Sequence, residues 1–547
     1  MLVSNYQNQE IMKKINSYVQ VALLVLLIGT ITSSCEDFLE EENRTNLTDE
    51  NAFDEPGAFA QLVANTYNKM RAATIRFRLD NTGTDIITRK AIIAGANELN
   101  DYVNIDPANG TISDYWNDHY DVVTAANLTI SRVNEIPGLS DEEIDLGLGE
   151  VRFFRAFAYF KLVEQFGDVP LILEEITTAR TDFTRAPQNE VYEQILSDLD
   201  DAIANVEANP EQYGRVSKDA ARHLKAKVLL TRGYKSFANS SDFADAAALA
   251  ETVIASHPLV SDFASLTSIE NQRNSEVILA MLYGTEQLAI GRGNNRHKLF
   301  KFTYDLYPGM ERTQEFNNGT DDAPTPFYYT LFEDEDEREE ATLRRVIFAI
   351  RDSDDGSILI GDTAIFFPEI PWTDEQKAGV NYQVVNEGDY FRPNGFSTVH
   401  FPMFRRYDDP VAPLTTTDGN PLGQRDAAII RSGETILLAA EAQLNAGNAE
   451  AAANHLNTLR ARAGITTILS AADVDLDFIL DERARELAGE VSRWLDLKRT
   501  GKLIERVLAH NPHAALNNAI EPRHLVRPIP QAEVDLSNGS IRQNDDY

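Results

Sequence analysis

One segment of the sequence is apolar around most of a helical circumference. Residues 150–166 contain no helix breaker, and Gly167 and Pro170 end the segment. At about 100° per residue, the apolar side chains fill two broad sectors. The remaining narrow sector is polar and holds Glu150, Lys161, Glu164 and Gln165. We expect this polar edge to face solvent and the rest of the helix to be buried in a larger all-helical body.

Two arginines interrupt the apolar part of this helix. Arg152 and Arg155 lie on the same side as Tyr159 and Phe166. A buried guanidinium without a carboxylate partner costs several kcal/mol, roughly 3–5 in mutational studies. We therefore interpret both arginines as members of structural ion pairs, in preference to direct ligand contacts.

The helical period recurs along both halves of the chain. It is clear in the segments 58–70, 114–133, 190–206 and 218–234. Ala220–Gly233 precedes the alanine-rich segment Phe243–Ala250, and Glu434–Gly447 precedes Ala449–Leu456. Small residues let two antiparallel helices pack closely, as in tetratricopeptide units. The pattern predicts a mainly α fold with tetratricopeptide-like helical repeats.

Two stretches lack this period. Residues 74–111 are rich in loop-forming glycines, and residues 284–424 are punctuated by Gly, Pro and Asn. Nine of the 33 residues from Phe300 to Phe332 are aromatic, whereas aromatic residues make up 9% of the whole chain. This composition argues against disorder. The aromatic rings either attach the loops to the scaffold or stack on a ligand, and the sequence leaves both readings open.

The acidic run Glu333–Glu337 supplies oxygen ligands that Ca²⁺ would accept. It lacks the glycine-containing loop of a calcium hand. We therefore predict a solvated helix start and no metal site.

Composition narrows the class of function. The net charge is −36, which argues against nucleic-acid binding, because phosphate contacts need clustered Lys and Arg. A single cysteine rules out an internal disulfide and a cysteine-based zinc site. The sequence contains no G-x-S-x-G, H-E-x-x-H or P-loop pattern, so it predicts no catalytic residue and no cofactor. With 86 carboxylates, a pair at glycosidase spacing could arise by chance.

The amino-terminal segment has the features of an export signal. Lys13 and Lys14 precede an apolar run from Val19 to Ile31, and small residues lead to Cys35. We predict that residues 1–35 are a signal peptide, that Met12 is the true start, and that Cys35 is the lipidated first residue of the mature protein. The segment before Cys35 resembles a lipobox, although Thr32 stands where leucine is commonest. The acidic residues that follow resemble an export signal for the cell surface.

Several separated motifs resemble those of one family. They are Arg152-Phe153-x-Arg155-Ala156-x-x-Tyr159-Phe160-x-Leu162 with Phe166-Gly167-Asp168-Val169-Pro170-Leu171, then Glu482-Arg483 through Arg493-Trp494-x-Asp496-Leu497, and finally Pro528-Ile529-Pro530 with Gln543-Asn544-x-x-Tyr547. These residues resemble the signature of the SusD/RagB family, although Asp545-Asp546 replaces a Pro-Gly pair. The resemblance implies a lipid-anchored, surface-exposed outer-membrane lipoprotein. Such a protein is not an enzyme, and it binds a nutrient glycan beside a SusC-like TonB-dependent transporter. Peptide binding of the RagB type and a surface glycoside hydrolase remain the alternatives.

The resemblance also implies irregular helical repeats that form a scaffold and long irregular loops that complete it. On this reading the mature chain is one body with three regions. They are an N-terminal helical region (36–283), a loop-rich aromatic ligand-binding region (284–424) and a C-terminal helical region (425–547). Similar proteins draw their ligand loops from comparable regions. We therefore expect the two irregular stretches to converge on one shallow, aromatic-lined surface away from the repeat helices. The expected ligand residues are Arg89, Asn100, Tyr102, Tyr304, Tyr307, Tyr328 and Trp372.

The anchor prediction is testable by fractionation. Several acyl chains on one cysteine hold a protein at a membrane stably, whereas a protein without them has no such anchor. We expect Cys35→Ser to move the protein from the membrane fraction to the soluble fraction. A variant that remains membrane-bound after its signal is processed would contradict lipidation at Cys35.

Overall fold

The computed structural model describes residues 12–20, 53, 55, 57–74, 76–89, 98–284, 293–311, 322–390, 400–409 and 422–547. Cys35 and the predicted lipobox lie outside the described residues. Among the described residues, no helix is both long enough and apolar enough to span a membrane.

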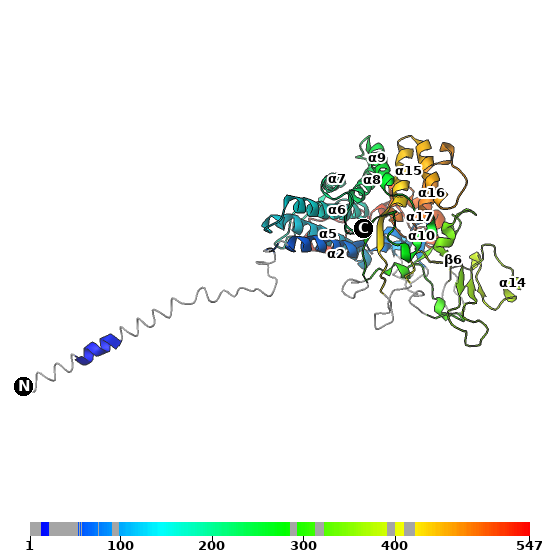
Figure 1. Cartoon of the computed structure of the whole chain (residues 1–547), viewed down its shortest axis with the longest axis horizontal. Helices are drawn as coiled ribbons and strands as arrows, with labels where there is room; N and C mark the ends of the chain where they lie inside the picture. Colours follow the sequence, from blue (N-terminus) through cyan, green and yellow to red (C-terminus); the bar gives the residue numbers. More distant parts are fainter. Residues whose placement is uncertain are drawn as a thin grey trace, which may run out of the picture.

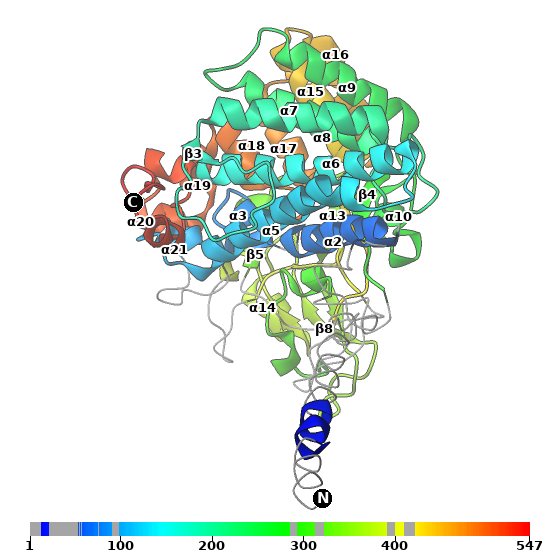
Figure 2. The ribbon, with the colours of Figure 1, turned by 90° about the vertical axis from the view of Figure 1, so that its left-hand side faces the viewer.

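The scaffold is a succession of helices in which each packs against the next. It comprises α2 (Gly57–Thr74), α5 (Gly110–Arg132), α6 (Asp141–Phe166), α7 (Gln188–Asn205), α8 (Lys218–Gly233), α9 (Asp242–Ser256), α15 (Ser432–Asn445) and α16 (Ala449–Arg462). Figure 1 shows the whole chain, and Figure 2 shows α2, α5, α6 and α7 stacked as layers. The predicted mainly α, repeat-based fold is confirmed.

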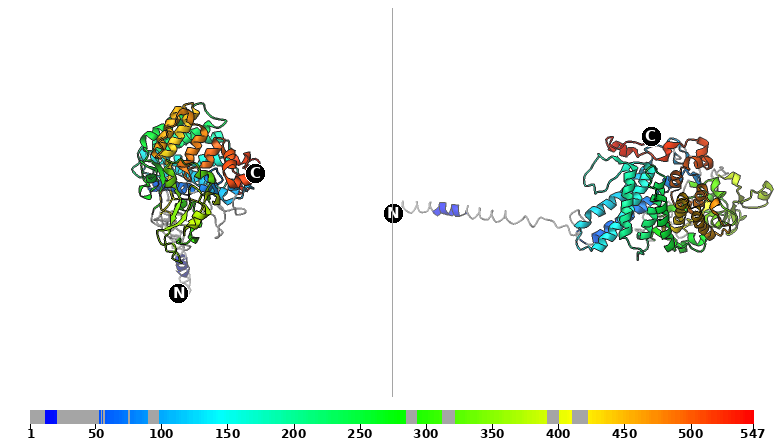
Figure 3. Two further views of the ribbon diagram at one scale, coloured as in Figure 1. Left: turned by 90° about the vertical axis from the view of Figure 1, so that its right-hand side faces the viewer. Right: turned by 90° about the horizontal axis from the view of Figure 1, so that it is seen from above.

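The two helix pairs identified in the sequence lie side by side although they are far apart in the chain. Helix α9 packs against both α8 and α15. Ala226, Ala250 and Ala439 form the contact, and all three are fully buried. Because alanine side chains are short, the three helix backbones can approach closely. In both views of Figure 3, the orange and red helices of the C-terminal half lie against the cyan and green helices of the first half.

Shorter helices and strands complete the fold. The remaining C-terminal helices are α17 (Leu476–Leu487), α18 (Arg493–Arg499), α19 (Leu503–His510), α20 (Pro512–Asn517) and α21 (Gln531–Leu536). The other short helices are α3 (Phe77–Asn81), α4 (Glu98–Asp101), α10 (Phe263–Thr267), α12 (Pro326–Tyr329), α13 (Arg338–Thr342) and α14 (Asp374–Ala378). Antiparallel pairs join β1 (Ile87–Arg89) to β5 (Asp322–Pro324), β2 (Val169–Pro170) to β3 (Arg185–Ala186), β4 (Val277–Met281) to β11 (Ala427–Arg431), and β6 (Leu343–Arg344) to β10 (Met403–Phe404). A three-stranded sheet contains β7 (Val346–Phe348), β8 (Thr363–Phe366) and β9 (Gln383–Val384).

Helix α6 lies at the centre of the largest core cluster. A capping box between Ser140 and Glu143 begins it, and Gly167, with a positive φ of 78°, ends it where the sequence predicts. At its C-terminal end, the carbonyl of Gln165 accepts from the backbone N–H of Arg527 at 2.7 Å. The carbonyl of Phe166 accepts from the side-chain amide of Asn544 at 2.9 Å. Residues from far along the chain therefore satisfy carbonyl groups that a helix end leaves unpaired.

The polar residues of α6 confirm one prediction and correct another. Arg152 pairs with Asp201, and Arg155 pairs with Asp198 at 2.7 Å, as predicted for structural ion pairs. The predicted solvent-facing edge is wrong, because Glu150, Glu164 and Gln165 are all buried. Other elements cover this edge and neutralise its charges: Arg215 pairs with Glu150 at 2.6 Å, while Lys235 and Lys498 pair with Glu164 at 2.8 and 3.3 Å.

A buried ion network, here called the Glu486 network, joins the C-terminal helices to the irregular middle. Glu486 on α17 pairs with three guanidinium groups, of Arg431, Arg462 and Arg338. All four side chains are almost fully buried. The charges of residues 479–499 alternate in sign along the sequence, and the structure places many of them in the interior. Glu482, Glu276 and Glu490 extend the network through further bonds to the same arginines.

A glycine leaves the space that this network needs. A Cβ atom added at Gly433 would lie 2.1 Å from a guanidinium nitrogen of Arg431 and 2.7 Å from a carboxylate oxygen of Glu486. No side chain larger than hydrogen fits there unless the ion pair moves.

Removal of one charge from the network is expected to destabilise the fold. Glu486→Gln leaves three buried guanidinium groups short of an anionic partner, so we expect the free energy of unfolding to fall by about 3–5 kcal/mol. Glu505→Gln is the matched control. It removes an exposed carboxylate paired with Lys502 and should change stability by less than about 0.5 kcal/mol. Urea titrations compare the two variants, and equal losses would contradict a structural role for the network.

Candidate functional site

The two irregular stretches of the sequence meet at a short antiparallel seam. Strand β1 pairs with β5 in the register Ile87↔Pro324, Thr88↔Ala323 and Arg89↔Asp322. The side chain of Thr325 also donates to the carbonyl of Asp85 at 2.6 Å. The seam therefore joins residues about 240 positions apart and brings the two irregular stretches into contact in the interior.

Buried charges fix the seam to the C-terminal helices. Asp85, just before β1, accepts from Arg493 on α18 and Arg506 on α19 at 2.6 and 2.9 Å. Burial alone would raise the pKa of Asp85, but the two guanidinium groups lower it to about 2. Asn511 supplies neutral support, because its amide donates to the carbonyl of Thr84 at 3.0 Å. Loops held in this way present their side chains in a fixed geometry.

A polar hollow, here called the seam hollow, opens beside β1. Its volume is about 360 Å³, within the range of about 300–1,000 Å³ typical of ligand pockets. The residues that line it come from α3, β1, α4 and the start of α5: Arg78, Thr82, Arg89, Glu98, Leu99, Asn100, Asn109, Gly110, Thr111 and Asp114. Nearly all of these side chains are polar, so the hollow offers both donors and acceptors to hydroxyl groups.

The polar groups of the seam hollow are held by local bonds. The Asn109 side chain accepts from the backbone N–H groups of Thr111 and Ile112 and so caps α5. Its amide group donates to Glu98 at 2.5 Å. Arg78 lies 3.8 Å from the carboxylate of Asp322, across the seam. Arg78 and Asp114 are both well exposed, with 40% and 56% of their side chains accessible.

The seven predicted ligand residues do not lie together. Arg89 and Asn100 line the seam hollow, although both are largely buried. Trp372 is half-buried and packs on Phe366, with ring centroids 5.4 Å apart, in the separate β7–β8–β9 sheet. Ligand contact by these three residues stays a prediction.

The four predicted tyrosines are core residues, which corrects the expectation of an exposed aromatic surface. Tyr102, Tyr304, Tyr307 and Tyr328 are 0–2% exposed. Tyr102 donates its hydroxyl to the carbonyl of Gly83 at 2.7 Å, and Tyr328 packs against the rings of three other aromatic residues. The described part of the middle region contains only short helices, and its rings build a second core cluster against α17. Rings enclosed in this way have no free face for a sugar.

The sequence missed several residues of the seam hollow. Arg78, Glu98, Asn109 and Asp114 line it, but none belongs to a recognisable motif. A usable signal was the Asn109–Gly110 pair before a long helical period, which marks the cap of α5 and so the position of one wall.

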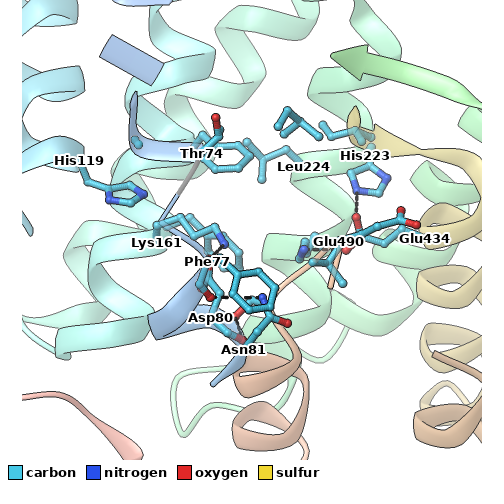
Figure 4. Close-up of a pocket in the computed structure, with 18 of the residues that line it drawn as sticks. Thr74, Phe77, Asp80, Asn81, His119, Lys161, His223, Leu224, Glu434 and Glu490 are labelled. Carbon is cyan, nitrogen blue, oxygen red and sulfur yellow. Dashed lines mark hydrogen bonds and ion pairs between the residues drawn. The ribbon is translucent and has the colours of Figure 1, made fainter. Parts of the chain in front are cut away.

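A second cavity lies inside the scaffold, between the two halves of the chain (Figure 4). Its volume of about 60 Å³ holds a few water molecules, since a water needs about 10–15 Å³ of such space, and it is too small for a sugar ring. Lys161 pairs with Asp80 at 2.8 Å, and Glu434 pairs with Lys227 at 2.6 Å and His223 at 3.2 Å. Burial lowers the pKa of His119 to about 4, which keeps that imidazole neutral. We interpret these matched charges as structural.

Two family models match the chain. The model described as "Starch-binding associating with outer membrane" matches residues 37–234, and the model described as "SusD family" matches residues 275–547. Among relatives, SusD-like protein P25 of Formosa agariphila is 26% identical over 92% of this chain and 94% of its own length. Starch-binding protein SusD of Bacteroides thetaiotaomicron is 24% identical over 76% of this chain and 75% of its own length.

Solved structures share the fold. A laminarin binding SusD-like protein superposes with a TM-score of 0.68 at 24% identity, covering 90% of this chain and all of its own. A SusD homologue from Bacteroides thetaiotaomicron superposes with a TM-score of 0.72 at 18% identity, covering 92% of this chain and all of its own. At such identities the likeness establishes the fold alone.

The ion pairs of Asp85 with Arg493 and Arg506 should make the stability of the fold depend on pH. A carboxyl whose folded-state pKa is lowered contributes stability above its unfolded pKa, about 3.9 for aspartate, and loses it as the pH falls through the folded-state value. For Asp85 this loss falls between about pH 4 and pH 2. We therefore expect Asp85→Asn to be clearly less stable than wild type at neutral pH, with the difference narrowing as the pH falls. Denaturant titrations at several pH values measure the free energy of unfolding of both proteins. A difference between them that is independent of pH would contradict a stabilising role for these ion pairs.

Proposed function

Because the chain belongs to the SusD/RagB family, as its two family models show, we propose that it is a cell-surface lipoprotein that binds a nutrient glycan in the seam hollow. The observation that carries this proposal is the hollow itself. It has the volume of a ligand site, most of the described side chains that line it are polar, and its walls are fixed to the scaffold by buried ion pairs. Carboxylate, amide and guanidinium groups at fixed positions match the alternating donors and acceptors of sugar hydroxyls.

The binding role is that of a carrier and not of an enzyme. The relatives carry names such as "Starch-binding protein SusD" and "Laminarin binding SusD-like protein", which describe binding. In the seam hollow, Glu98 already accepts a hydrogen bond from Asn109, and Asp114 is paired with Arg76. We assign both to hydrogen bonding with the ligand.

The proposed partner is a SusC-like TonB-dependent transporter in the outer membrane. A lipid anchor at Cys35 would hold the binding body at the cell surface, and the transporter would take up the captured glycan. The description "associating with outer membrane" of one matching family model supports this location. Co-purification of such a barrel with the lipidated chain tests the partnership.

A double variant tests whether the seam hollow binds the glycan. Arg78→Ala/Asp114→Ala removes two exposed charged groups, and each hydrogen bond to a charged group contributes roughly 1.5–3 kcal/mol. We expect the Kd for the glycan that wild type binds to rise at least tenfold, with little change in the melting temperature. Calorimetry against laminarihexaose, maltohexaose and a mixed peptide library provides the measurement. The matched control is Arg180→Ala/Asp182→Ala, which removes an exposed ion pair of the same types outside the hollow.

The outcomes separate the candidate functions. Binding of an oligosaccharide that is lost in the double variant and kept in the control supports the proposal. Binding of peptides alone would replace it with the RagB-type function. Release of shorter sugars by the purified protein would replace it with a hydrolase.

A further inference from the structure

A second and larger groove lies away from the seam hollow, and no residue lines both. This groove, here called the β6–β7 groove, has a volume of about 700 Å³. One wall is the acidic run with α13, and the other contains β6, β7, Glu369 and Arg405. In Figure 1 its elements lie on the right, near the labels of β6 and α14.

The acidic wall is held rigidly by two residues that turn inward. Asp336 and Arg338 are fully buried and pair with each other at 2.8 Å. Arg338 also pairs with Glu482 on α17 at 2.6 Å, so the run is tied into the Glu486 network. The sequence suggested a solvated helix start, and α13 does begin at Arg338. The inward-facing pair makes this segment a fixed wall and not a mobile, solvated one.

The neighbours of the inward pair face outward in consequence. Asp334, Glu337 and Glu340 are exposed, and all three line the groove. Ion pairs and hydrogen bonds hold other carboxylates of the wall, since Glu333 pairs with Arg460 and Glu339 pairs with Arg345. The wall therefore presents several acceptor oxygens in fixed positions.

The opposite wall offers an aromatic face and a free cation. In β7, Ile347 is fully buried and the next residue, Phe348, is 55% exposed, as the alternation of a strand dictates. The Phe348 ring lines the groove. Arg405 also lines it and is exposed, and among the described residues it has no ion-pair partner.

These groups match the chemistry of a sugar. An exposed ring packs against the C–H face of a pyranose, while carboxylates accept from hydroxyls and a guanidinium donates to them. The charge balance selects among sugars, because the described residues that line the groove include seven carboxylates besides the inward-facing Asp336 and three guanidinium groups. An acidic sugar would meet net repulsion there.

We propose that the β6–β7 groove is a second saccharide site, selective for uncharged over acidic glycans. This inference rests on the proposed glycan-binding function, and it names a separate surface and the ligand class. With two sites on one rigid body, a single long glycan could be held at two points, which would raise its apparent affinity without new contacts.

The test compares variants in the two sites by calorimetry and native mass spectrometry. Phe348→Ala/Arg405→Gln alters the groove, and Ile370→Ala/Arg351→Gln is its control, with an exposed apolar residue and a half-buried arginine outside the groove. The probes are laminarihexaose, maltohexaose and an oligomer of galacturonic acid. We expect wild type to take up two molecules of an uncharged hexasaccharide, and the groove variant and the seam-hollow variant Arg78→Ala/Asp114→Ala to take up one each. At low salt, the galacturonic acid oligomer should bind at least tenfold more weakly than the uncharged hexasaccharides. This difference in Kd should become smaller as salt screens the carboxylates.

Each other outcome counts against one specific statement. Unchanged stoichiometry and affinity in the groove variant would overturn the second site and leave the proposed function intact. A loss confined to the groove variant would support the groove and remove the seam hollow from the proposed function. Equal binding of the acidic oligomer would overturn the selectivity, and failure of every saccharide to bind wild type would overturn both proposals.

Discussion

The structure depends on charge pairing in its interior. Glu486 receives guanidinium groups from β11, α16 and α13, segments that are scattered over the second half of the chain. Any one of these groups left alone in the interior would cost several kcal/mol, roughly 3–5. The network is therefore favourable only when all its segments are in place, and it ties the irregular middle region to the helical scaffold. Asp85 plays the same part at the seam, where Arg493 and Arg506 fix a loop of the first half to helices of the second.

Both proposed binding surfaces follow from this arrangement. The seam hollow is built on a strand that begins beside Asp85, and the β6–β7 groove is built on a run that contains Arg338. In each case a buried charge pair fixes a segment that has little regular structure, and its neighbours then face outward. Preorganised polar groups on a rigid support lose little entropy when a ligand binds.

The local features of the fold could be predicted from the sequence, whereas the long-range ones could not. The end of α6 at Gly167, the ion pairs of Arg152 and Arg155, and the alanine-rich helix pairs follow from periodicity and from the cost of burying charge. The burial of Glu164 does not, because its partners Lys235 and Lys498 lie about 70 and 330 residues away in sequence. Likewise, the density of aromatic residues indicated an ordered middle region, but composition cannot distinguish a ring in a core from one on a surface. Tyr304 and Tyr328 form that core, and the hollow beside it is lined by polar residues without a motif.

The C-terminal end of α6 is completed by residues from the last part of the chain. The carbonyls of Gln165 and Phe166 receive their hydrogen bonds from Arg527 and Asn544, which are made more than 350 residues later. During synthesis from the amino terminus, α6 is complete long before those donors are made. Until those donors are made, the two carbonyls lack their partners and the apolar surface of the central helix is exposed, which favours aggregation. The C-terminal end of the central helix is thus completed only when the last segment of the chain docks against it.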